Sequence, residues 1–329
     1  MAPACLTIGV AIASYRRPDD LKRCLEALSE QSRLPDDVIV VVRADDEASR
    51  NAVAAASAGP LPVRQLFVSA PGTVPARNVA LTHCRTDILS FVDDDTVPHR
   101  DWVERIVPYF ADDPALGGLG GRDRIHDGTS FDDRTARDVG RIQWFGRVVP
   151  NHHLGVGAPR TVDFIKGANM SFRAAAFRNI KFDARLRGTG AQPYEDLVFS
   201  SAVRRAGWKL LYDPGVVVDH FLGKREETRH YADIATVKDR QGFQNFAFNG
   251  VVAVWDELPV SGLIAFALWS LAVGTGICPG FLQAVRFTPK LGAASWQRFA
   301  LALSGKLDAF IELGLRQRGV LHEAAKRMP

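Results

Sequence analysis

The chain is poor in cysteine, and this scarcity limits the kinds of site it can hold. Only four cysteines occur among 329 residues, they are scattered, and no two of them form a CxxC pair. A disulfide framework and a structural zinc site are therefore disfavoured, and a reducing compartment fits best.

A strong excess of charge of one sign is also missing. The 41 Lys and Arg residues against 37 Asp and Glu residues give a formal net charge of +4. This excess is too small to predict a nucleic-acid partner, and we expect none. A basic surface can still meet an anionic membrane or a phosphate-bearing substrate.

Two signatures are absent near the N-terminus. No Lys or Arg precedes the short apolar run 6–13, so the run is interpreted as a buried strand and not as a signal peptide. No GxGxxG follows that run, and the cluster of Gly118, Gly120 and Gly121 has neither the spacing nor the position of that fingerprint. A dinucleotide-dependent oxidoreductase is therefore disfavoured.

What is present is an alternation of strand-like and helix-like segments. Apolar β-formers predict strands at 6–13, 38–42, 63–68, 88–92 and 215–218. Helical spacing predicts helices from Pro18, at 47–57, at 75–84 and from Tyr194 to about Arg205. A further strand-then-helix unit begins near Phe164, and the glycine-rich stretch 117–157 is expected to form loops and short strands around a site. This is the pattern of an α/β fold with a mostly parallel sheet, in which ligands bind at the carboxyl ends of the strands.

An acidic triplet, Asp93, Asp94 and Asp95, follows directly after the predicted strand 88–92. Adjacent carboxylates repel one another unless a divalent cation or solvent neutralises them. Hard oxygen ligands suit Mg²⁺ or Mn²⁺, which commonly bridge to substrate phosphates. The alternative is a solvated acidic turn.

Four further segments carry polar groups that suit a site. In the stretch 72–78 (GTVPARN) a glycine turn enters a helix, where backbone amides and Arg77 suit a phosphate or a nucleobase. The stretch 167–173 (GANMSFR) suggests a close approach of backbone to ligand. The stretch 194–196 (YED) can supply a general base, and His220 comes just after the predicted strand 215–218. The structural alternatives are an ordinary helix start, a tight turn, a helix cap and an isolated histidine.

Taken in order, these segments resemble glycosyltransferase family 2, an inverting group with the GT-A fold. The matching stretches are 12–18 (IASYRRP), 72–78, 91–95 (FVDDD), 167–173, 194–196 and 218–220 (VDH). The resemblance implies a Rossmann-like, mostly parallel central sheet flanked by helices over residues 1–222. Residues 223–329 are expected to form a helical, membrane-associated extension.

The resemblance also assigns roles by position. Asp196 would be the catalytic base and Glu195 would orient the acceptor. Asp95 would bind the metal, Mn²⁺ or Mg²⁺, with support from Asp93 and a further ligand in His220. The nucleotide-binding residues would be Ser14, Arg16, Asp45, Arg77 and Asp94, with Asp94 on the ribose; the sugar-binding residues would be Gly167 and Asn169.

One departure from the family pattern concerns the nucleobase. The family usually has an aspartate directly after its second strand, whereas here Val42 is followed by Arg43, and Asp45 and Asp46 come later. A uridine diphosphate sugar is expected because it is the family's commonest donor, but the base is left open.

The C-terminal region points to a membrane. Residues 224–240 are charged and expected to be helical, whereas 258–285 contains no charged residue at all. That run is long enough to cross a bilayer, but glycines and Pro279 interrupt its second half, so an interfacial segment and a buried core helix are alternatives. We expect a location at the cytoplasmic face of the inner (plasma) membrane and a lipid-linked saccharide acceptor.

The predicted function is transfer of a sugar from a nucleotide-diphosphate donor to an acceptor hydroxyl by single displacement. A sugar-phosphate nucleotidyltransferase is one alternative, but an enzyme of that class needs a glycine- and basic-rich loop after the first strand, and residues 14–17 (SYRR) contain no glycine. A non-catalytic nucleotide-sugar-binding scaffold at the membrane is the other. The stretch 240–244 (RQGFQ) is not the QxxRW pattern of processive synthases, so addition of a single sugar is favoured.

Overall fold

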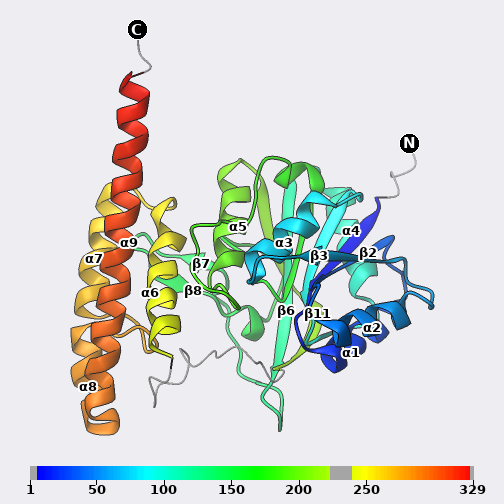
Figure 1. Cartoon of the computed structure of the whole chain (residues 1–329), viewed down its shortest axis with the longest axis horizontal. Coiled ribbons are helices and arrows are strands. Elements are labelled where there is room, and N and C mark those ends of the chain that lie inside the picture. Colours follow the sequence, from blue (N-terminus) through cyan, green and yellow to red (C-terminus); the bar gives the residue numbers. More distant parts are fainter. Residues whose placement is uncertain (1–5, 223–238, 327–329) are drawn as a thin grey trace. The chain divides into compact units, whose positions relative to one another are not determined.

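The computed structural model describes residues 6–222 and 239–326 (Figure 1). The chain divides into two compact units, an α/β unit and a helical unit. The described part of the helical unit comprises residues 239–326 and two short segments from earlier in the chain, Trp144–Arg147 and Ala184–Tyr194. The rest of the described chain forms the α/β unit.

The α/β unit is built on one mixed sheet, which confirms the predicted fold class. Four neighbouring strands, β3, β2, β1 and β4, are all parallel, while β10 runs antiparallel to both β4 and β6. In spatial order the strands are β3 (Val63–Val68), β2 (Asp37–Arg43), β1 (Ile8–Ala13), β4 (Ile88–Asp93), β10 (Asn169–Arg173), β6 (Leu116–His126), β11 (Lys209–Phe221) and β5 (Thr96–Pro98), with β9 (Arg160–Thr161) beside β11 and a separate pair β7 (Arg141–Ile142) and β8 (Val148–Val149).

Helices flank this sheet, and all but the one at residues 102–112 lie where a helix was predicted from the sequence. The helix from Pro18 buries Leu21, Cys24, Leu25 and Leu28, the residues whose spacing predicts it. These side chains share one core with the apolar faces of β1 and of the helix around Trp102. The helices are α1 (Pro18–Ser29), α2 (Glu47–Ala56), α3 (Thr73–Thr82), α4 (Trp102–Asp112) and α5 (Glu195–Arg205), with short 3-10 turns at His152–Leu154 and Ala174–Phe177.

The glycine-rich stretch was expected to be irregular, and for its first part this prediction is wrong. Residues 116–126 form β6, an inner strand between β10 and β11. The glycines allow neighbours to come close: a Cβ at Gly120 would meet Ile165 Cγ2 at 2.5 Å, and one at Gly121 would meet the Val216 carbonyl oxygen at 2.1 Å. Here glycine marks close packing in a strand and not a loop.

The strand predicted at 215–218 is the middle of a longer one. β11 covers Lys209–Phe221 and pairs in parallel with β6, with a register shift between Asp213 and Val217. His220 therefore lies within the strand and not beyond its end. The consequence is that β6 and β11 place residues 123 and 220 on adjacent strands.

The helical unit contains α6 (Arg240–Trp255), α7 (Val260–Ala272), α8 (Phe281–Leu291) and α9 (Ala293–Lys326). Phe243 and Ala247 of α6 pack against Leu301 and Ala302 of α9. The helix predicted at 224–240 falls almost wholly outside the described residues.

The uncharged run 258–285 is broken into two helices. α7 ends at Ala272 and α8 begins at Phe281, with Gly274 between them at a φ of 66° and Arg298 bonded to the carbonyls of Gly276 and Ile277. Within 6–222 and 239–326, no helix has both the length and the apolar character needed to cross a bilayer. The run 258–285 therefore does not form a single continuous helix.

Candidate active site

The acidic triplet lies at the carboxyl end of β4. Asp94 and Asp95 are buried, and Asp93 is half-buried. One ligand atom each from Asp93, Asp95 and His220 lie within 4.8 Å of one another. These are the three residues assigned to the metal from the sequence, and the pairing of β11 with β5 and β6 brings the third to the first two.

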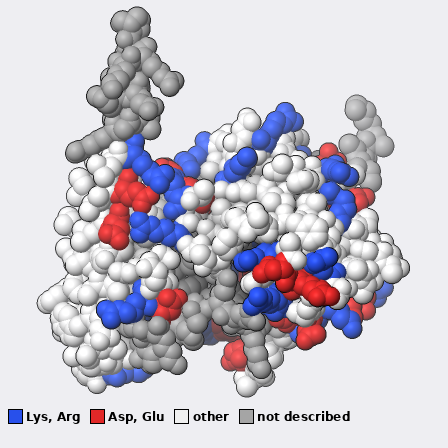
Figure 2. Space-filling model, in the orientation of Figure 1, with Lys and Arg blue, Asp and Glu red and all other residues white. Residues whose placement is uncertain are grey.

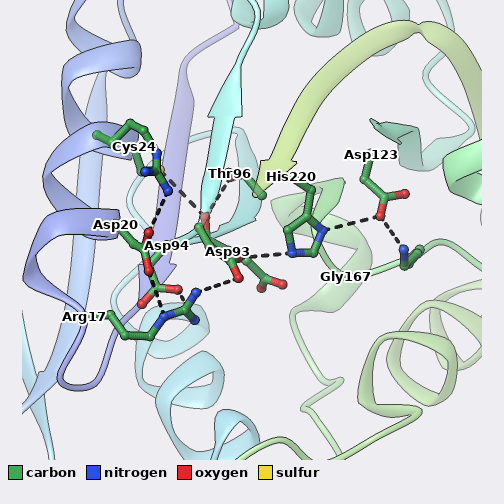
Figure 3. Close-up of polar contacts among 12 residues, drawn as sticks. Arg17, Asp20, Cys24, Asp93, Asp94, Thr96, Asp123, Gly167 and His220 are labelled. Carbon is green, nitrogen blue, oxygen red and sulfur yellow. Dashed lines mark hydrogen bonds and ion pairs between the residues drawn. The ribbon is translucent and has the colours of Figure 1, made fainter. Parts of the chain in front are cut away.

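Arg17, which none of the sequence motifs had assigned to the site, offsets part of the triplet's negative charge. Arg17, directly before α1, places one guanidinium nitrogen 2.7 Å from Asp94 Oδ1 and the other 2.5 Å from Asp95 Oδ2 (Figure 3). The carboxylates around it raise the pKa of Arg17 against the opposing effect of burial. Three adjacent carboxylates after a buried strand need a compensating positive charge, so the triplet itself could have directed attention to a nearby arginine.

His220 lies between two carboxylates. Its Nε2 is 3.2 Å from Asp95 Oδ1, and its Nδ1 is 3.6 Å from Asp123 Oδ2 (Figure 3). Burial alone would lower the pKa of His220, but Asp123 and Asp95 outweigh burial and raise it to about 9. The protonated ring and Arg17 together offset the acidic triplet.

Asp123 and Lys166 form the outer layer of this arrangement. Lys166 Nζ contacts Asp123 Oδ2, and Asp123 is almost fully buried. Although burial favours the neutral carboxyl, Lys166 and His220 hold the pKa of Asp123 well below its usual range. Neither residue was found from the sequence, because Asp123 comes beside His220 only through the β6–β11 pairing, and Lys166 lies 43 residues farther along the chain than Asp123.

The donor set fits a hard divalent cation. Two carboxylates and one imidazole converge, and Asp123 on the far ring nitrogen is the outer partner that metal-bound histidines generally have. Carboxylates suit Mg²⁺ and Mn²⁺, and an imidazole nitrogen in the set favours Mn²⁺ over Mg²⁺. Asp93, Asp95 and His220 would hold the ion.

Asp123→Asn is expected to weaken Mn²⁺ binding by about 10- to 100-fold, because the amide no longer orients the imidazole as a carboxylate does. Isothermal titration with MnCl₂ measures this. Asp213→Asn is the matched control: Asp213 is a buried carboxylate on the neighbouring strand β11, but it is bonded to Tyr109 and lies outside the triad. Equal Mn²⁺ affinity of the two variants would remove Asp123 from the site.

The predicted catalytic pair opens α5. Glu195 is buried, and Arg77 Nη1 donates to both of its oxygens at 2.6 and 2.7 Å. Arg77 Nη2 lies 2.9 Å from Asp93 Oδ1, so one guanidinium connects the acidic pair with the metal triad. Burial raises the pKa of Glu195 to about 8, while the charge of Arg77 opposes this shift.

Asp196 is held by backbone groups. Gly167 N donates to Asp196 Oδ2 at 2.7 Å, and Leu197 N donates to Oδ1 at 2.8 Å. A Cβ at residue 167 would lie 2.9 Å from Arg77 Nη1, so glycine allows the guanidinium and the Asp196 carboxylate to approach the same peptide. Gly167 therefore positions Asp196.

Asn169 is buried and its side chain is fully used within the protein. Its Oδ1 accepts from Trp102 Nε1 at 2.9 Å, and its Nδ2 donates to the carbonyls of Val216 and Arg122. These bonds tie β10 to α4, β6 and β11. The predicted sugar contact of Asn169 stays a prediction.

Three of the residues assigned to the nucleotide, Ser14, Arg16 and Asp45, follow β1 or β2, whereas Arg77 belongs to α3 and Asp94 follows β4. Ser14 Oγ donates to Asp94 Oδ2 at 2.8 Å, and burial raises the pKa of Asp94 to about 7 against the effect of Arg17. Arg16 is exposed at a φ of 54°, with its guanidinium over the Tyr15 ring. Asp45 is also exposed, 3.5 Å from the Tyr15 hydroxyl.

The family follows from comparison of the whole chain. A family model described as Glycosyltransferase like family 2 matches residues 3–242, and the chain belongs to this family. Among curated proteins, the Pre-mycofactocin glycosyltransferase of Mycobacterium tuberculosis is 27% identical over 158 residues, 45% of this chain and 30% of that protein. The Succinoglycan biosynthesis protein ExoM of Rhizobium meliloti is 32% identical over 108 residues, 31% of this chain and 34% of that protein. Each match spans about a third of the relative's length.

Solved structures share the fold. The mannosyltransferase PcManGT of Pyrobaculum calidifontis, in complex with GDP-Man and Mn²⁺, has a TM-score of 0.54 at 16% identity, covering 93% of this chain and 87% of that one. Residues 1–349 of S. aureus TarS, in complex with UDP-GlcNAc, have a TM-score of 0.56 at 15% identity, covering 95% and 92%. At these identities the likeness shows the GT-A fold alone.

Proposed function

We propose that this chain is a metal-dependent, inverting glycosyltransferase that moves a sugar from a nucleotide-diphosphate donor to an acceptor hydroxyl. The observation that carries the proposal is the juxtaposition of two sets of acids through Arg77: the cation triad on one side and the Glu195–Asp196 pair on the other. A site of this kind has a place for a diphosphate and, beside it, a base for a hydroxyl.

In this mechanism Asp196 accepts the proton of the acceptor hydroxyl as that oxygen attacks the anomeric carbon. Its two backbone hydrogen bonds fix the carboxylate in one orientation before the acceptor arrives. Glu195, held by Arg77, orients the acceptor. The nucleotide diphosphate departs from the opposite face of the sugar, so the anomeric configuration is inverted.

The cation on Asp93, Asp95 and His220 would act as a Lewis acid for the charge that develops on the departing diphosphate. Arg17 is a fixed positive charge at the same place, 2.5 Å from Asp95. Because a metal-bound imidazole is neutral, binding of the ion would release the proton of His220. We propose Mn²⁺ as the ion, in line with the Mn²⁺ bound by PcManGT.

A UDP-sugar is the proposed donor, as the family pattern implies, and TarS, a protein of the same fold, binds UDP-GlcNAc. The base would meet the polar edge of β1 and β2 around Tyr15, Arg43 and Asp45. Arg43 stands where the family has an aspartate, and its guanidinium covers the Tyr15 ring at 4.7 Å.

A lipid-linked saccharide at the cytoplasmic face of the plasma membrane is the proposed acceptor. The chain connectivity supports this proposal. The segment Ala184–Tyr194 belongs to the helical unit, for which membrane association is proposed, and it leads directly into Glu195, the residue proposed to orient the acceptor. Buried Asn249 of α6 fixes the segment by bonding to Arg187 and Pro193. ExoM, a curated relative, is named for the biosynthesis of a polysaccharide, succinoglycan.

A thermal-shift screen tests the donor site. Purified protein is heated with UDP-, GDP-, CDP- and TDP-linked sugars, with and without MnCl₂. We expect the melting temperature to rise with UDP-sugars when Mn²⁺ is present, because a ligand that binds only the folded state stabilises it. No rise with any donor, in buffer or detergent, would contradict the proposed donor site, whereas a rise without hydrolysis or transfer would favour the non-catalytic nucleotide-sugar-binding scaffold.

A further inference from the structure

Two helices of the helical unit turn large apolar side chains toward solvent. Six of these side chains are 46% to 64% exposed, and together we call them the apolar face: Ile264, Leu268 and Leu271 of α7, and Phe281, Leu282 and Val285 of α8. A helix that only packs on a core would place such residues inward.

The arrangement is a stripe and not a scatter. Ile264, Leu268 and Leu271 follow one another at intervals of four and three residues, which puts them on one side of α7. α8 buries only Ala284 and leaves its largest apolar residues outside. Contiguous exposed apolar surface of this kind marks an interaction site.

The charges in this region have one sign. From residue 258 to residue 307 the chain contains Arg286, Lys290, Arg298 and Lys306, and no Asp or Glu. Arg286 directly follows Val285 on α8, Lys290 lies about one turn later, and both are exposed. In Figure 2 most of the surface on the left belongs to uncharged residues, and the charged side chains seen there are both basic and acidic. An apolar surface edged by cations complements an anionic lipid surface.

Phe281 of the apolar face belongs to an aromatic cluster with residues of α9. Phe281 and Trp296 have ring centroids 5.8 Å apart, and Phe299 lies 6.2 Å from Trp296. Trp296 is 39% exposed. Tryptophan is enriched at the depth of lipid headgroups, because its ring is apolar and its N–H is polar.

We propose that the apolar face lies on the surface of an anionic bilayer, with α7 and α8 in the plane of the interface and Arg286 and Lys290 among the headgroups. This inference deepens the proposed membrane location by naming the surface that makes the contact and the lipid charge it prefers. It rests on exposure and charge within the helical unit and not on the transfer reaction.

Vesicle co-sedimentation of the full chain tests the proposal, with no donor or acceptor present. The probes are vesicles of phosphatidylcholine alone and of phosphatidylcholine with phosphatidylglycerol. We expect stronger binding to the anionic vesicles. The affinity of the double variant Leu268→Ser, Leu282→Ser for the anionic vesicles is expected to fall at least about tenfold, because two exposed apolar contacts are lost. Arg286→Gln with Lys290→Gln is expected to lose roughly tenfold on anionic vesicles only.

Leu34→Ser with Phe67→Ser is the matched control. These two apolar residues are also exposed, at 39% and 52%, but belong to the α/β unit, so the same chemical change should leave vesicle binding intact. Circular dichroism confirms that each variant is folded.

Unchanged binding in the α7–α8 variants would overturn the proposal. A concentration-dependent dimer that those variants abolish, without vesicle binding, would instead assign the face to a second copy of the chain. Donor hydrolysis in solution, measured separately, tests the transfer reaction.

Discussion

Asp196→Asn is expected to lower kcat by about 10²- to 10⁴-fold, the usual contribution of a positioned general base. The amide has nearly the shape of the carboxylate and can still accept one of the two backbone hydrogen bonds, so the protein should fold, but it accepts no proton. Since Asp196 is not one of the triad ligands, the Mn²⁺-dependent stabilisation by the donor should persist. Turnover is measured as nucleotide diphosphate released in the presence of acceptor.

Two comparisons make this result specific. Asp112→Asn changes an exposed carboxylate at the end of α4 in the same way and should leave kcat unchanged. The thermal shift of Asp196→Asn with donor and Mn²⁺ should match that of the unaltered protein. A variant that retains full turnover shows that another group is the base, and one that loses donor binding shows that Asp196 acts before the chemical step.

Asp95→Asn is expected to abolish Mn²⁺-dependent donor stabilisation and to lower kcat/KM by about 10²- to 10³-fold. A Lewis-acid cation contributes several kcal/mol, and each 1.36 kcal/mol corresponds to a factor of ten. Asp95 is fully buried and is the triad member in contact with both Arg17 and His220. Titration calorimetry with MnCl₂ measures the loss of binding directly.

Asp94→Asn is the control for this change. Asp94 is the neighbouring buried carboxylate and also pairs with Arg17, at 2.7 Å, but it is not part of the triad. It should keep its affinity for Mn²⁺ alone and bind the nucleotide more weakly if it contacts the ribose. If the two variants lose Mn²⁺ binding equally, the triplet acts through its total charge and Asp95 is not a specific ligand.

Much of the site could be predicted because its residues follow strands that hydrophobicity reveals. The apolar run 88–92 ends at the acidic triplet, and parallel strands bring their carboxyl ends to one edge of a sheet. His220 joins that edge in the structure as expected. By contrast, Gly118, Gly120 and Gly121 carry no apolar side chain for periodicity to detect, so β6 was missed together with Asp123.

The charge balance of the site could not be predicted in the same way. Ion pairs form between groups far apart in the chain: Lys166 meets Asp123 across 43 residues, and Arg77 meets Glu195 across 118. No local pattern encodes such pairs. The sequence indicated Arg77 as a nucleotide contact, and only the packing of α3 against the start of α5 shows it between Glu195 and Asp93.

By itself, the sequence determined the α/β class, the order of the motifs and the acidic residues of the site, because hydrophobic periodicity and local turn chemistry act over a few residues. The tertiary structure decided which charges neutralise one another, that the glycines around residue 120 build an inner strand, and that the uncharged run is two helices with an exposed apolar face. These outcomes depend on contacts between distant segments, where close packing and the cost of burying an uncompensated charge select one arrangement.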